Sequence, residues 1–183
     1  QVPNYLQLVE EEEKAAFKGS QKITVSTSCF WSGEKVYGQI PGVLNTKALY
    51  TSAGEAVEIT YDPTSTTQDQ ILTEGKKRNV ANFVVLQNES NKSYSIPSKK
   101  VNTIRADPET KYYLYTSEYR IVPMTPLQAL KVNAYLGEGL PCEKFLSPRQ
   151  LDYFKNRSTL KLSCKQNQIG KDFMTAWYQC SGF

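Results

Sequence analysis

The sequence predicts an α+β fold in which a mixed sheet is flanked by helices. Patterns typical of strands and of helices follow one another without the strict alternation that a doubly wound α/β fold requires. The length of 183 residues suits one domain with its own core. An apolar content of 39% and a charged content of 22% are ordinary for a globular chain.

The first third of the chain predicts two helices and three strands. Residues 5–18 are predicted to form a surface helix. Their apolar side chains recur near helical spacing, and the acidic run among them would form a solvent-exposed face. Residues 22–27 and 55–61 alternate apolar and polar side chains and predict strands, with a further strand near 45–51. Ser32 is suited to cap a helix that runs to about Ile40, where Pro41 and Gly42 follow.

Residues 74–111 are the least regular part of the chain and predict an inserted hairpin or extended surface loop. The apolar run over 83–86 should be a strand, and polar residues follow it. A short helix is predicted just before this part, near residues 66–73.

The second half begins with aromatic and apolar residues that predict a strand near 114–122, in one sheet with the earlier strands. Pro126 should open a helix to about Leu136, since proline is favoured in the first turn. A short helix is predicted over 147–156. We divide the chain into an N-terminal helical segment (1–21), a main domain (22–156, with the 74–111 insertion) and an irregular C-terminal tail with two cysteines (157–183).

Charge and composition narrow the possible partners. The net charge is +4 with Lys and Arg spread along the chain, and no basic stretch is interleaved with aromatics, so we expect no nucleic-acid partner. No apolar run approaches the roughly 20 residues of a membrane span, so we expect no membrane partner. The chain has no histidine, which excludes histidine acid/base catalysis and argues against zinc or copper. We therefore expect no metal and no cofactor.

Three features indicate a secreted or extracellular glycoprotein. Asn88, Asn91 and Asn156 each begin an Asn-x-Ser sequon. The chain starts at Gln1 without Met, as a product of signal removal would. The cysteine count is even, at four. The alternative is that the sequons arose by chance, because the pattern is short. Four cysteines allow three pairings, and the sequence does not choose among them.

Cys29 is the main candidate for chemistry. It lies between a predicted strand and a predicted helix, where free N–H groups and the helix dipole stabilise an anion and so favour the reactive thiolate. Phe30 and Trp31 follow at once and could wall an apolar pocket for a methyl or thioether group. The alternative is that Cys29 forms half of a disulfide and both aromatics belong to the core, and the residues alone favour this alternative.

The segment Ser28-Cys29-Phe30-Trp31-Ser32-Gly33-Glu34 resembles the Gly-Cys-Phe-Trp-Gly active-site segment of A-type peptide methionine sulfoxide reductases. The resemblance spans about residues 22–164, with one large interruption. Five later segments agree with the family in the same order: Ile40-Pro41-Gly42-Val43; Tyr50-Thr51; Gly54-Glu55-Ala56-Val57 with Tyr61-Asp62-Pro63; Glu118-Tyr119-Arg120 with Pro123-Met124-Thr125-Pro126; and Glu143-Lys144-Phe145 with Gln150, Tyr153 and Lys155-Asn156.

The resemblance implies a role for each matched residue. Cys29 would attack the sulfur of methionine sulfoxide and become a sulfenic acid. Glu55 would protonate the sulfoxide oxygen, and Tyr119 would donate a hydrogen bond to that oxygen. Phe30 and Trp31 would bind the substrate's methyl group. Without the resemblance, Glu55 would be interpreted as an ordinary strand residue that faces solvent. Tyr119 would be interpreted as an aromatic residue of the core or of a sheet edge.

The other three cysteines have alternative roles. Cys164 and Cys180 lie where the family places cysteines that regenerate the enzyme by thiol–disulfide exchange, but they could equally form a permanent disulfide. Cys142 has no role in the family pattern, and it is either buried and inert or paired with Cys29.

The chain also departs from the family. Only Ser52 and Ala53 remain of a Gly-rich loop that carries a second substrate-binding tyrosine, and Leu114 stands where the family has an aspartate. The resemblance implies thiol-dependent reduction of methionine S-sulfoxide in a peptide or protein, with a thiol reductant that the sequence does not identify. The alternative is a secreted protein that kept the fold but lost catalysis and has a structural or binding role.

Overall fold

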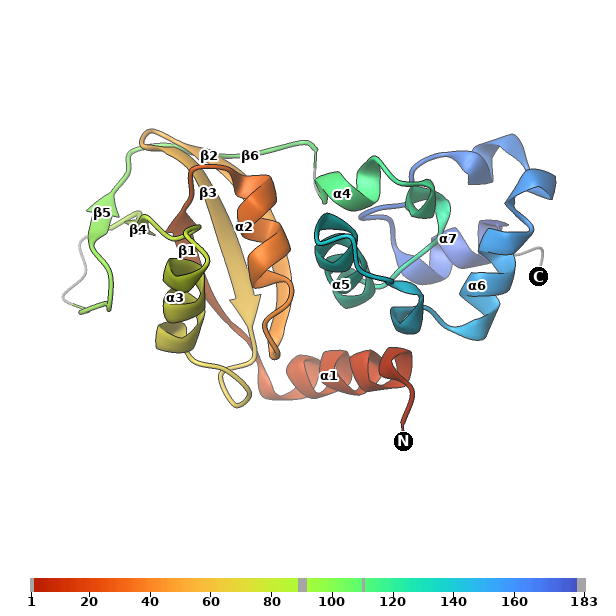
Figure 1. Cartoon of the computed structure of the whole chain (residues 1–183), viewed down its shortest axis with the longest axis horizontal. Coiled ribbons are helices and arrows are strands. Elements are labelled where there is room, and N and C mark those ends of the chain that lie inside the picture. Colours follow the sequence, from red (N-terminus) through yellow and green to blue (C-terminus); the bar gives the residue numbers. More distant parts are fainter. Residues whose placement is uncertain (1, 89–91, 110, 181–183) are drawn as a thin grey trace.

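A computed structural model of the chain describes residues 2–88, 92–109 and 111–180. It is an α+β structure, with a sheet at one end and a helical lobe at the other (Figure 1). The strands are β1 Gln21–Ser26, β2 Val43–Thr51, β3 Gly54–Tyr61, β4 Phe83–Leu86, β5 Ser98–Lys100 and β6 Ile104–Ala106. The helices are α1 Asn4–Lys18, α2 Phe30–Tyr37, α3 Gln68–Lys77, α4 Tyr112–Tyr115, α5 Pro126–Gly137, α6 Pro148–Lys155 and α7 Phe173–Cys180. Short 3₁₀ turns are η1 Glu118–Ile121, η2 Glu143–Phe145, η3 Arg157–Thr159 and η4 Leu162–Lys165.

The strands of the described residues form one mixed sheet in the order β5-β4-β1-β3-β2-β6. The β4–β5 pair is parallel and the other pairs are antiparallel. In the central strand β3, Val57, Ile59 and Tyr61 are buried in the main core, as their alternation predicts. Glu58 lies between them in sequence and instead forms an ion pair with Lys22 at 2.8 Å.

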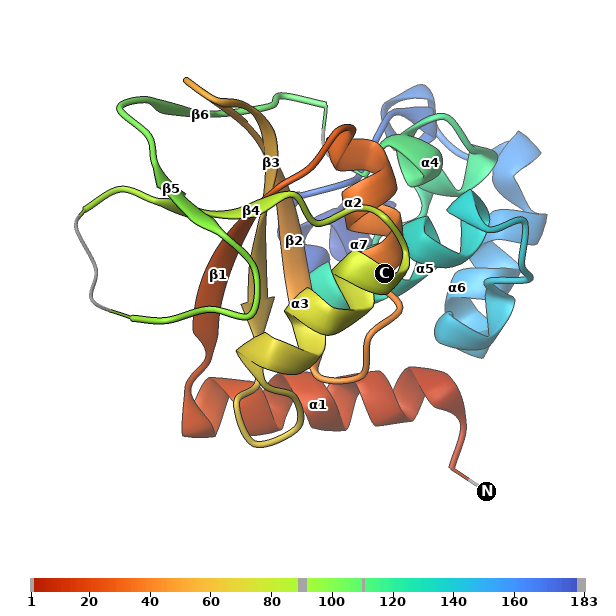
Figure 2. The same cartoon turned by 60° about the vertical axis from the view of Figure 1, so that its left-hand side comes forward.

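Helices α2 and α3 cover one face of the sheet, and α1 runs beneath the sheet and the lobe (Figures 1 and 2). The lobe contains α4, α5, α6 and α7. None of the helices in residues 2–88, 92–109 and 111–180 combines the length and the apolar character that crossing a membrane would require.

Most of the predicted elements are confirmed. The strands predicted at 22–27, 45–51, 55–61 and 83–86 correspond to β1, β2, β3 and β4, and the helices predicted at 5–18, 66–73 and 147–156 correspond to α1, α3 and α6. Helix α5 begins at Pro126 as predicted, after Thr125, whose side chain accepts from Gln128 N–H in a capping box.

The helix after Cys29 begins earlier than predicted. Cys29, and not Ser32, is the N-cap of α2, and the helix ends at Tyr37. Of the two forms predicted for 74–111, a hairpin or an extended surface loop, the described strands do not form the hairpin. Strand β4 pairs with β1, β6 pairs with β2, and β4 and β5 run parallel. These short strands therefore extend both edges of the main sheet and do not form a separate unit.

The strand predicted near 114–122 is also wrong, because this segment forms α4 and η1. Its aromatic residues favour a strand, but tertiary contacts override that preference. The backbone N–H of Leu114 donates to the buried Asn133 Oδ1 of α5 at 3.0 Å, and Ser117 caps η1 by accepting from Tyr119 N–H. The edge of β2 that such a strand could have used is paired with β6.

A buried ion pair fixes the position of α2. Glu34 is 0% exposed, and its Oε1 accepts from Lys111 Nζ and from Thr46 Oγ1, each at 2.8 Å. Glu34 Oε2 accepts from the backbone N–H of Lys111 at 3.2 Å. These bonds tie α2 to β2 and to the start of α4. Gly33 allows the close approach, since a Cβ there would lie 2.9 Å from Val57 Cγ2.

The C-terminal end of α2 is held by a second buried lysine. Lys131 of α5 donates to the carbonyl oxygens of Gly38 at 2.9 Å and Ile40 at 3.1 Å. Burial lowers the pKa of Lys131 to about 8, partly offset by the negative charge of Glu11. A cation at this end of the helix also interacts favourably with the helix dipole.

We expect Lys111→Met to destabilise the fold by about 3–5 kcal/mol, because it leaves the Glu34 carboxylate buried without its cation. Adding Glu34→Gln should recover much of this loss, since the isolated charge is then removed. Chemical denaturation monitored by circular dichroism measures both values. Lys47→Met is the control, because Lys47 is exposed in β2 beside Thr46, and it should change stability by less than about 0.5 kcal/mol. Equal effects of Lys47→Met and Lys111→Met would contradict this role of the pair.

Candidate functional site

Cys29 lies at the N-terminus of α2, at the end of the short connection that follows β1. Its backbone is extended (φ −149°, ψ 117°), and its carbonyl oxygen accepts from Gly33 N–H at 3.0 Å. The thiol is free and half-buried. The structure thus places Cys29 at the start of a helix, as the sequence predicts.

Glu55 of β3 is brought next to Cys29. Its Oε2 accepts from the backbone N–H of Phe30 at 2.8 Å. Its carbonyl oxygen accepts from Thr27 N–H at 2.9 Å and from Ser26 Oγ at 3.3 Å. The connection between β1 and α2 is therefore fixed to Glu55 by both its backbone and its side chain. The side-chain contact is made by Oε2, at the first turn of α2.

Phe30 and Trp31 belong to a row of aromatic rings. Phe30 is 3% exposed and meets Tyr50 edge to face, with ring centroids 5.1 Å apart. The half-buried Trp31 stacks on Tyr112, with centroids 3.9 Å apart and planes 12° from parallel. Phe30 is therefore a core residue, and Tyr112 covers one face of Trp31. Binding of a substrate methyl group by Phe30 and Trp31 remains a prediction.

Tyr50 and Tyr112 are the site's neighbours that sequence reasoning missed. Tyr50 is the cross-strand partner of Glu55 in the β2–β3 hairpin, whose turn is Ser52 and Ala53. Strand register could have identified it, because Tyr50 and Glu55 lie at equal distances from that turn. Tyr112 could not be identified in this way, because its segment was predicted as a strand.

Cys29 opens onto a cavity of about 400 Å³ between α2 and the end of α3. The lining residues are Ser28, Cys29, Ser32, Lys35, Val36, Arg78, Asn79 and Val80. The cavity is therefore largely polar and carries two cations. Phe30, Trp31 and Glu55 are not among its lining residues, so Cys29 lies beside polar groups on this side.

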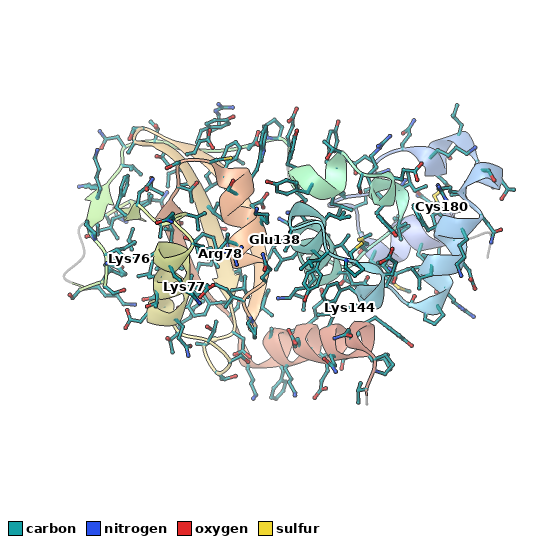
Figure 3. The ribbon with its side chains drawn as sticks, in the orientation of Figure 1. Lys76, Lys77, Arg78, Glu138, Lys144 and Cys180 are labelled. Carbon is teal, nitrogen blue, oxygen red and sulfur yellow. A yellow bond between two sulfur atoms is a disulfide. The ribbon has the colours of Figure 1, made fainter. Side chains whose placement is uncertain are left out.

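One carboxylate balances part of this positive charge. Glu138 Oε1 lies 2.7 Å from Arg78 Nη2 and 3.4 Å from Lys35 Nζ, and Figure 3 shows Arg78 and Glu138 close to one another. Burial opposes ionisation of Glu138, but a hydrogen bond from Gln39 and the charges of Lys35 and Arg78 lower its pKa overall. The three charged groups leave one net positive charge near Cys29.

Tyr119 makes its side-chain contacts with Glu143 and Phe154. Its hydroxyl donates to Glu143 Oε1 at 2.7 Å, and its ring stacks on Phe154 with centroids 4.2 Å apart. Both partners belong to the helical lobe. Burial and the neighbouring Glu143 raise the pKa of Tyr119 well above its ordinary value. A hydrogen bond from Tyr119 to a substrate at Cys29 would require the hydroxyl to leave Glu143.

Cys142 is a free thiol and 1% exposed, so the alternative of a Cys29–Cys142 disulfide is not what the structure contains. Burial, with a contribution from the negative charge of Glu143, raises the pKa of Cys142 to about 11. At neutral pH this thiol is protonated and shielded, which makes it a poor nucleophile.

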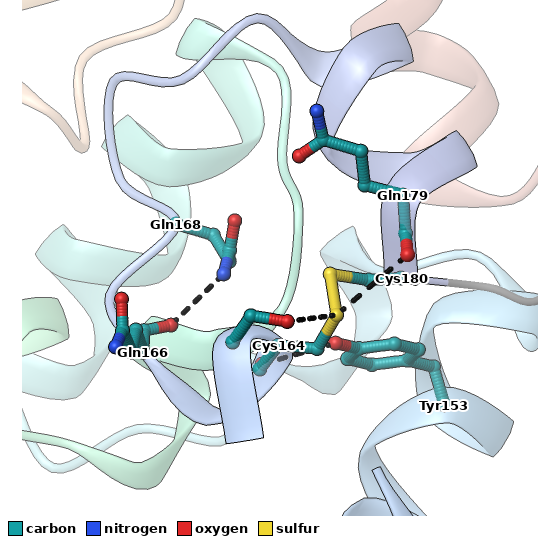
Figure 4. The surroundings of a disulfide bond; sticks show 7 residues. Tyr153, Cys164, Gln166, Gln168, Gln179 and Cys180 are labelled. Atoms are coloured by element: carbon teal, nitrogen blue, oxygen red, sulfur yellow. Dashed lines mark hydrogen bonds between the residues drawn. A yellow bond between two sulfur atoms is a disulfide. The ribbon is translucent and has the colours of Figure 1, made fainter. Parts of the chain in front are cut away.

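Cys164 and Cys180 form a disulfide, with an S–S distance of 2.08 Å and Cα atoms 5.4 Å apart. Figure 4 shows its surroundings in the lobe, where Tyr153 Oη donates to the carbonyl oxygen of Cys164 at 3.2 Å. Cys164 is buried and Cys180 half-buried. This bond is one of the three pairings that the four cysteines allow. A regenerating role for the two cysteines remains a prediction, since it requires this bond to open.

The predicted glycosylation sites lie away from Cys29 in sequence. Asn88 and Asn156 are exposed, and Asn91 lies outside the described residues. Within the described residues, no three His, Cys, Asp or Glu side chains converge in a way that could hold a metal ion.

Comparison with known proteins gives a partial match. Part of the chain is similar to the peptide methionine sulfoxide reductase MsrA of Geobacter sulfurreducens, at 32% identity over 69 residues. The match covers 28% of this chain and 43% of that protein, so the chain spans less than half the length of the curated relative it matches. No family model matches the chain. These findings indicate an MsrA-like relationship and are compatible with the α+β fold.

Proposed function

We propose that the chain is a thiol-dependent reductase of methionine S-sulfoxide in peptides, with Cys29 as the nucleophile and Glu55 as the acid. The observation that carries this proposal is the hydrogen bond between Glu55 Oε2 and Phe30 N–H, at 2.8 Å. It places a carboxyl group one residue from a free, half-buried thiol at a helix N-terminus. The partial similarity to MsrA supports the choice of substrate.

The proposed reaction has two stages. The thiolate of Cys29 attacks the sulfoxide sulfur while Glu55 transfers a proton to the oxygen. In the resulting adduct the oxygen passes from the methionine sulfur to the Cys29 sulfur and the bond between the two sulfurs breaks, so that the products are the Cys29 sulfenic acid and the methionine thioether. One thiol then attacks the sulfenic sulfur and releases water. A second thiol reduces the mixed disulfide and restores Cys29.

The thiols of the second stage come from outside the chain in this proposal. Cys142 is buried and free, and Cys164 and Cys180 are already joined in the helical lobe. The polar cavity at Cys29 gives an external thiol a path to the sulfenic acid. Two equivalents of a small thiol, or one of a dithiol, are sufficient.

The second candidate is a protein that kept the fold and lost catalysis. It is favoured by the stack of Tyr112 on Trp31, which covers part of the expected substrate pocket. It is also favoured by the hydrogen bond that holds Tyr119 on Glu143. The first proposal is preferred because Cys29 is free and Glu55 is beside it.

We also propose that the protein is secreted or extracellular. The sequons at Asn88 and Asn156 begin at exposed residues, and the Cys164–Cys180 disulfide is the kind of bond that persists in oxidising compartments.

We expect wild-type protein to reduce a peptide that contains methionine S-sulfoxide, with dithiothreitol as reductant, and not to reduce the R epimer. Cys29→Ser should abolish turnover because the nucleophile is lost. Glu55→Gln keeps the size but cannot release a proton in the same way, so the rate should fall by about 10²- to 10⁴-fold. Liquid chromatography of the two peptide forms measures the rates.

Glu58→Gln is the matched control for Glu55→Gln. Glu58 lies in the same strand but forms an ion pair with Lys22 away from the site, so its substitution should leave the rate within about twofold. Folded wild-type protein with a reduced Cys29 and no turnover of either epimer would support the second candidate. Turnover that survives Cys29→Ser would contradict the mechanism.

We expect iodoacetamide to modify one thiol per native chain at pH 7.5, and peptide mapping to place it at Cys29. At pH 7.5, Cys142 should react only after unfolding. Its reaction rate should rise as the pH approaches its pKa of about 11. Cys29→Ser is the control and should show no modification without denaturant. A chain with no reactive thiol even after unfolding would indicate a Cys29–Cys142 disulfide and would contradict the proposed site.

We expect protein from its natural source to carry glycan on at least one of Asn88 and Asn91, as the paired sequons predict. Intact mass spectrometry before and after glycosidase treatment measures this. A mass equal to the bare chain, together with free thiols at Cys164 and Cys180, would argue against an extracellular location.

A further inference from the structure

The helical lobe contains a cavity of about 460 Å³ that lies apart from the residues around Cys29. It is formed by η1 and by a later stretch of the chain that contains the end of α6, η3 and η4. The lining residues are Glu118, Arg120, Ile121, Lys155, Arg157, Ser158 and Lys165. Four cations and one carboxylate therefore surround the same space.

Much of the positive charge around this cavity comes from one short segment of the chain. Residues 155–171 contain five Lys and Arg residues and no Asp or Glu. The whole chain has 22 cationic and 18 acidic residues, which leaves 17 cationic and 18 acidic residues outside this segment. The net positive charge of the protein thus resides in the segment that builds the cavity.

Neutral hydrogen-bond acceptors hold two of the four cations in place. Arg120 Nη1 donates to the carbonyl oxygen of Ser117 at 3.2 Å, and Lys165 Nζ donates to that of Ser158 at 2.8 Å. A carbonyl acceptor restrains a cation without cancelling its charge. Each side chain also keeps further N–H groups for another acceptor.

Arg157 is the most firmly placed cation. Its Nη2 lies 2.8 Å from Glu118 Oε2, its Nη1 donates to the carbonyl oxygen of Phe154 at 3.1 Å, and its guanidinium lies 4.4 Å from the centroid of the Phe154 ring. Lys155 is 3.9 Å from Asp152, and both side chains are more than 70% exposed, so this pair compensates little charge. The lining thus carries a net charge of about +3 from its four cations and Glu118.

The walls of the cavity are also fixed to one another. The backbone N–H of Gln168 donates to the carbonyl oxygen of Arg120 at 2.8 Å, which joins the tail to η1. The Cys164–Cys180 disulfide lies next to Lys165 in sequence. The cationic side chains therefore project from a cross-linked frame, which lowers the entropic cost of arranging them around a ligand.

We propose that this cavity binds a small ligand that carries several phosphate or sulfate esters. Arginine and lysine N–H groups match the oxygens of tetrahedral oxyanions, and a volume of this size suits a small molecule. The lining contains no aromatic side chain on which bases could stack, which disfavours single-stranded nucleic acid. The proposal is independent of the chemistry at Cys29.

The test is isothermal titration of the intact, disulfide-bonded protein with three probes that share a six-membered ring: inositol hexakisphosphate, inositol hexasulfate and mellitate, which carries six carboxylates. We expect binding of one equivalent of at least one ester, and affinity that falls with salt because the cations are partly exposed. The tighter of the two esters identifies the oxyanion. Mellitate should bind at least tenfold more weakly.

Arg120→Gln and Lys165→Gln should each weaken binding of the preferred ester by about tenfold or more, since each removes a charge-assisted contact. Lys161→Gln and Lys171→Gln are the matched controls, because they remove the same charge from the same segment but do not line the cavity. They should change affinity by less than about twofold. Thermal unfolding checks that all four variants are folded.

Equal weakening by the lining and control variants would show diffuse attraction and overturn the proposal. Absence of binding by either ester, or mellitate that binds as tightly as the better ester, would overturn it as well. A loss of binding confined to Arg120→Gln and Lys165→Gln would support it.

Discussion

The Glu34 carboxylate is an ionised group inside the core, and the arrangement of the site depends on how its charge is compensated. A carboxylate without exposure is stable only when cations and donors surround it. Here those partners are Thr46 of β2 and Lys111, the residue just before α4. Because Glu34 lies just over one turn after Cys29, its bonds determine where the N-terminus of α2 points. They also join the sheet to the helical lobe.

Both ends of α2 are hydrogen-bonded to polar side chains from other elements. Glu55 Oε2 accepts from the first N–H of the helix, and Lys131 Nζ donates to carbonyl oxygens at the other end. The helix that follows Cys29 is therefore held at its start by Glu55 of β3, in its middle by Lys111 just before α4, and at its end by Lys131 of α5. Its short length of eight residues makes this support necessary, since isolated short helices are marginal.

The sequence predicts this framework well where local signals and tertiary packing agree. Pro126 with the Thr125 capping box defines α5, and the alternation of Val57, Ile59 and Tyr61 defines β3. The prediction fails where packing decides. Tyr112–Tyr115 has strand-forming side chains, but Lys111 adopts a positive φ of 57° and directs the chain into a helical turn.

The sequence likewise predicted some residues of the candidate site and not others. The strand-to-helix junction at Cys29 is visible in the sequence, whereas Glu55 was paired with Cys29 by the MsrA resemblance, and the structure places its carboxyl group at the residue after Cys29. The partners of Glu34 could not be identified, because Lys111 lies 77 residues away and only the folded chain brings it near. The MsrA resemblance assigned a role to Tyr119, whereas the structure joins its hydroxyl to Glu143.

The Cys164–Cys180 disulfide gives the tail a different kind of stability from that of the sheet. It closes a loop of sequence separation 16, and a loop of about that length removes roughly 3 kcal/mol of chain entropy from the unfolded state. Reduction returns that freedom to the segment that includes η4 and α7, while α2 and the strands that hold Cys29 are not cross-linked and lose nothing. The stability of the last part of the chain thus depends in part on whether Cys164 and Cys180 are oxidised, whereas the sheet contains no such bond.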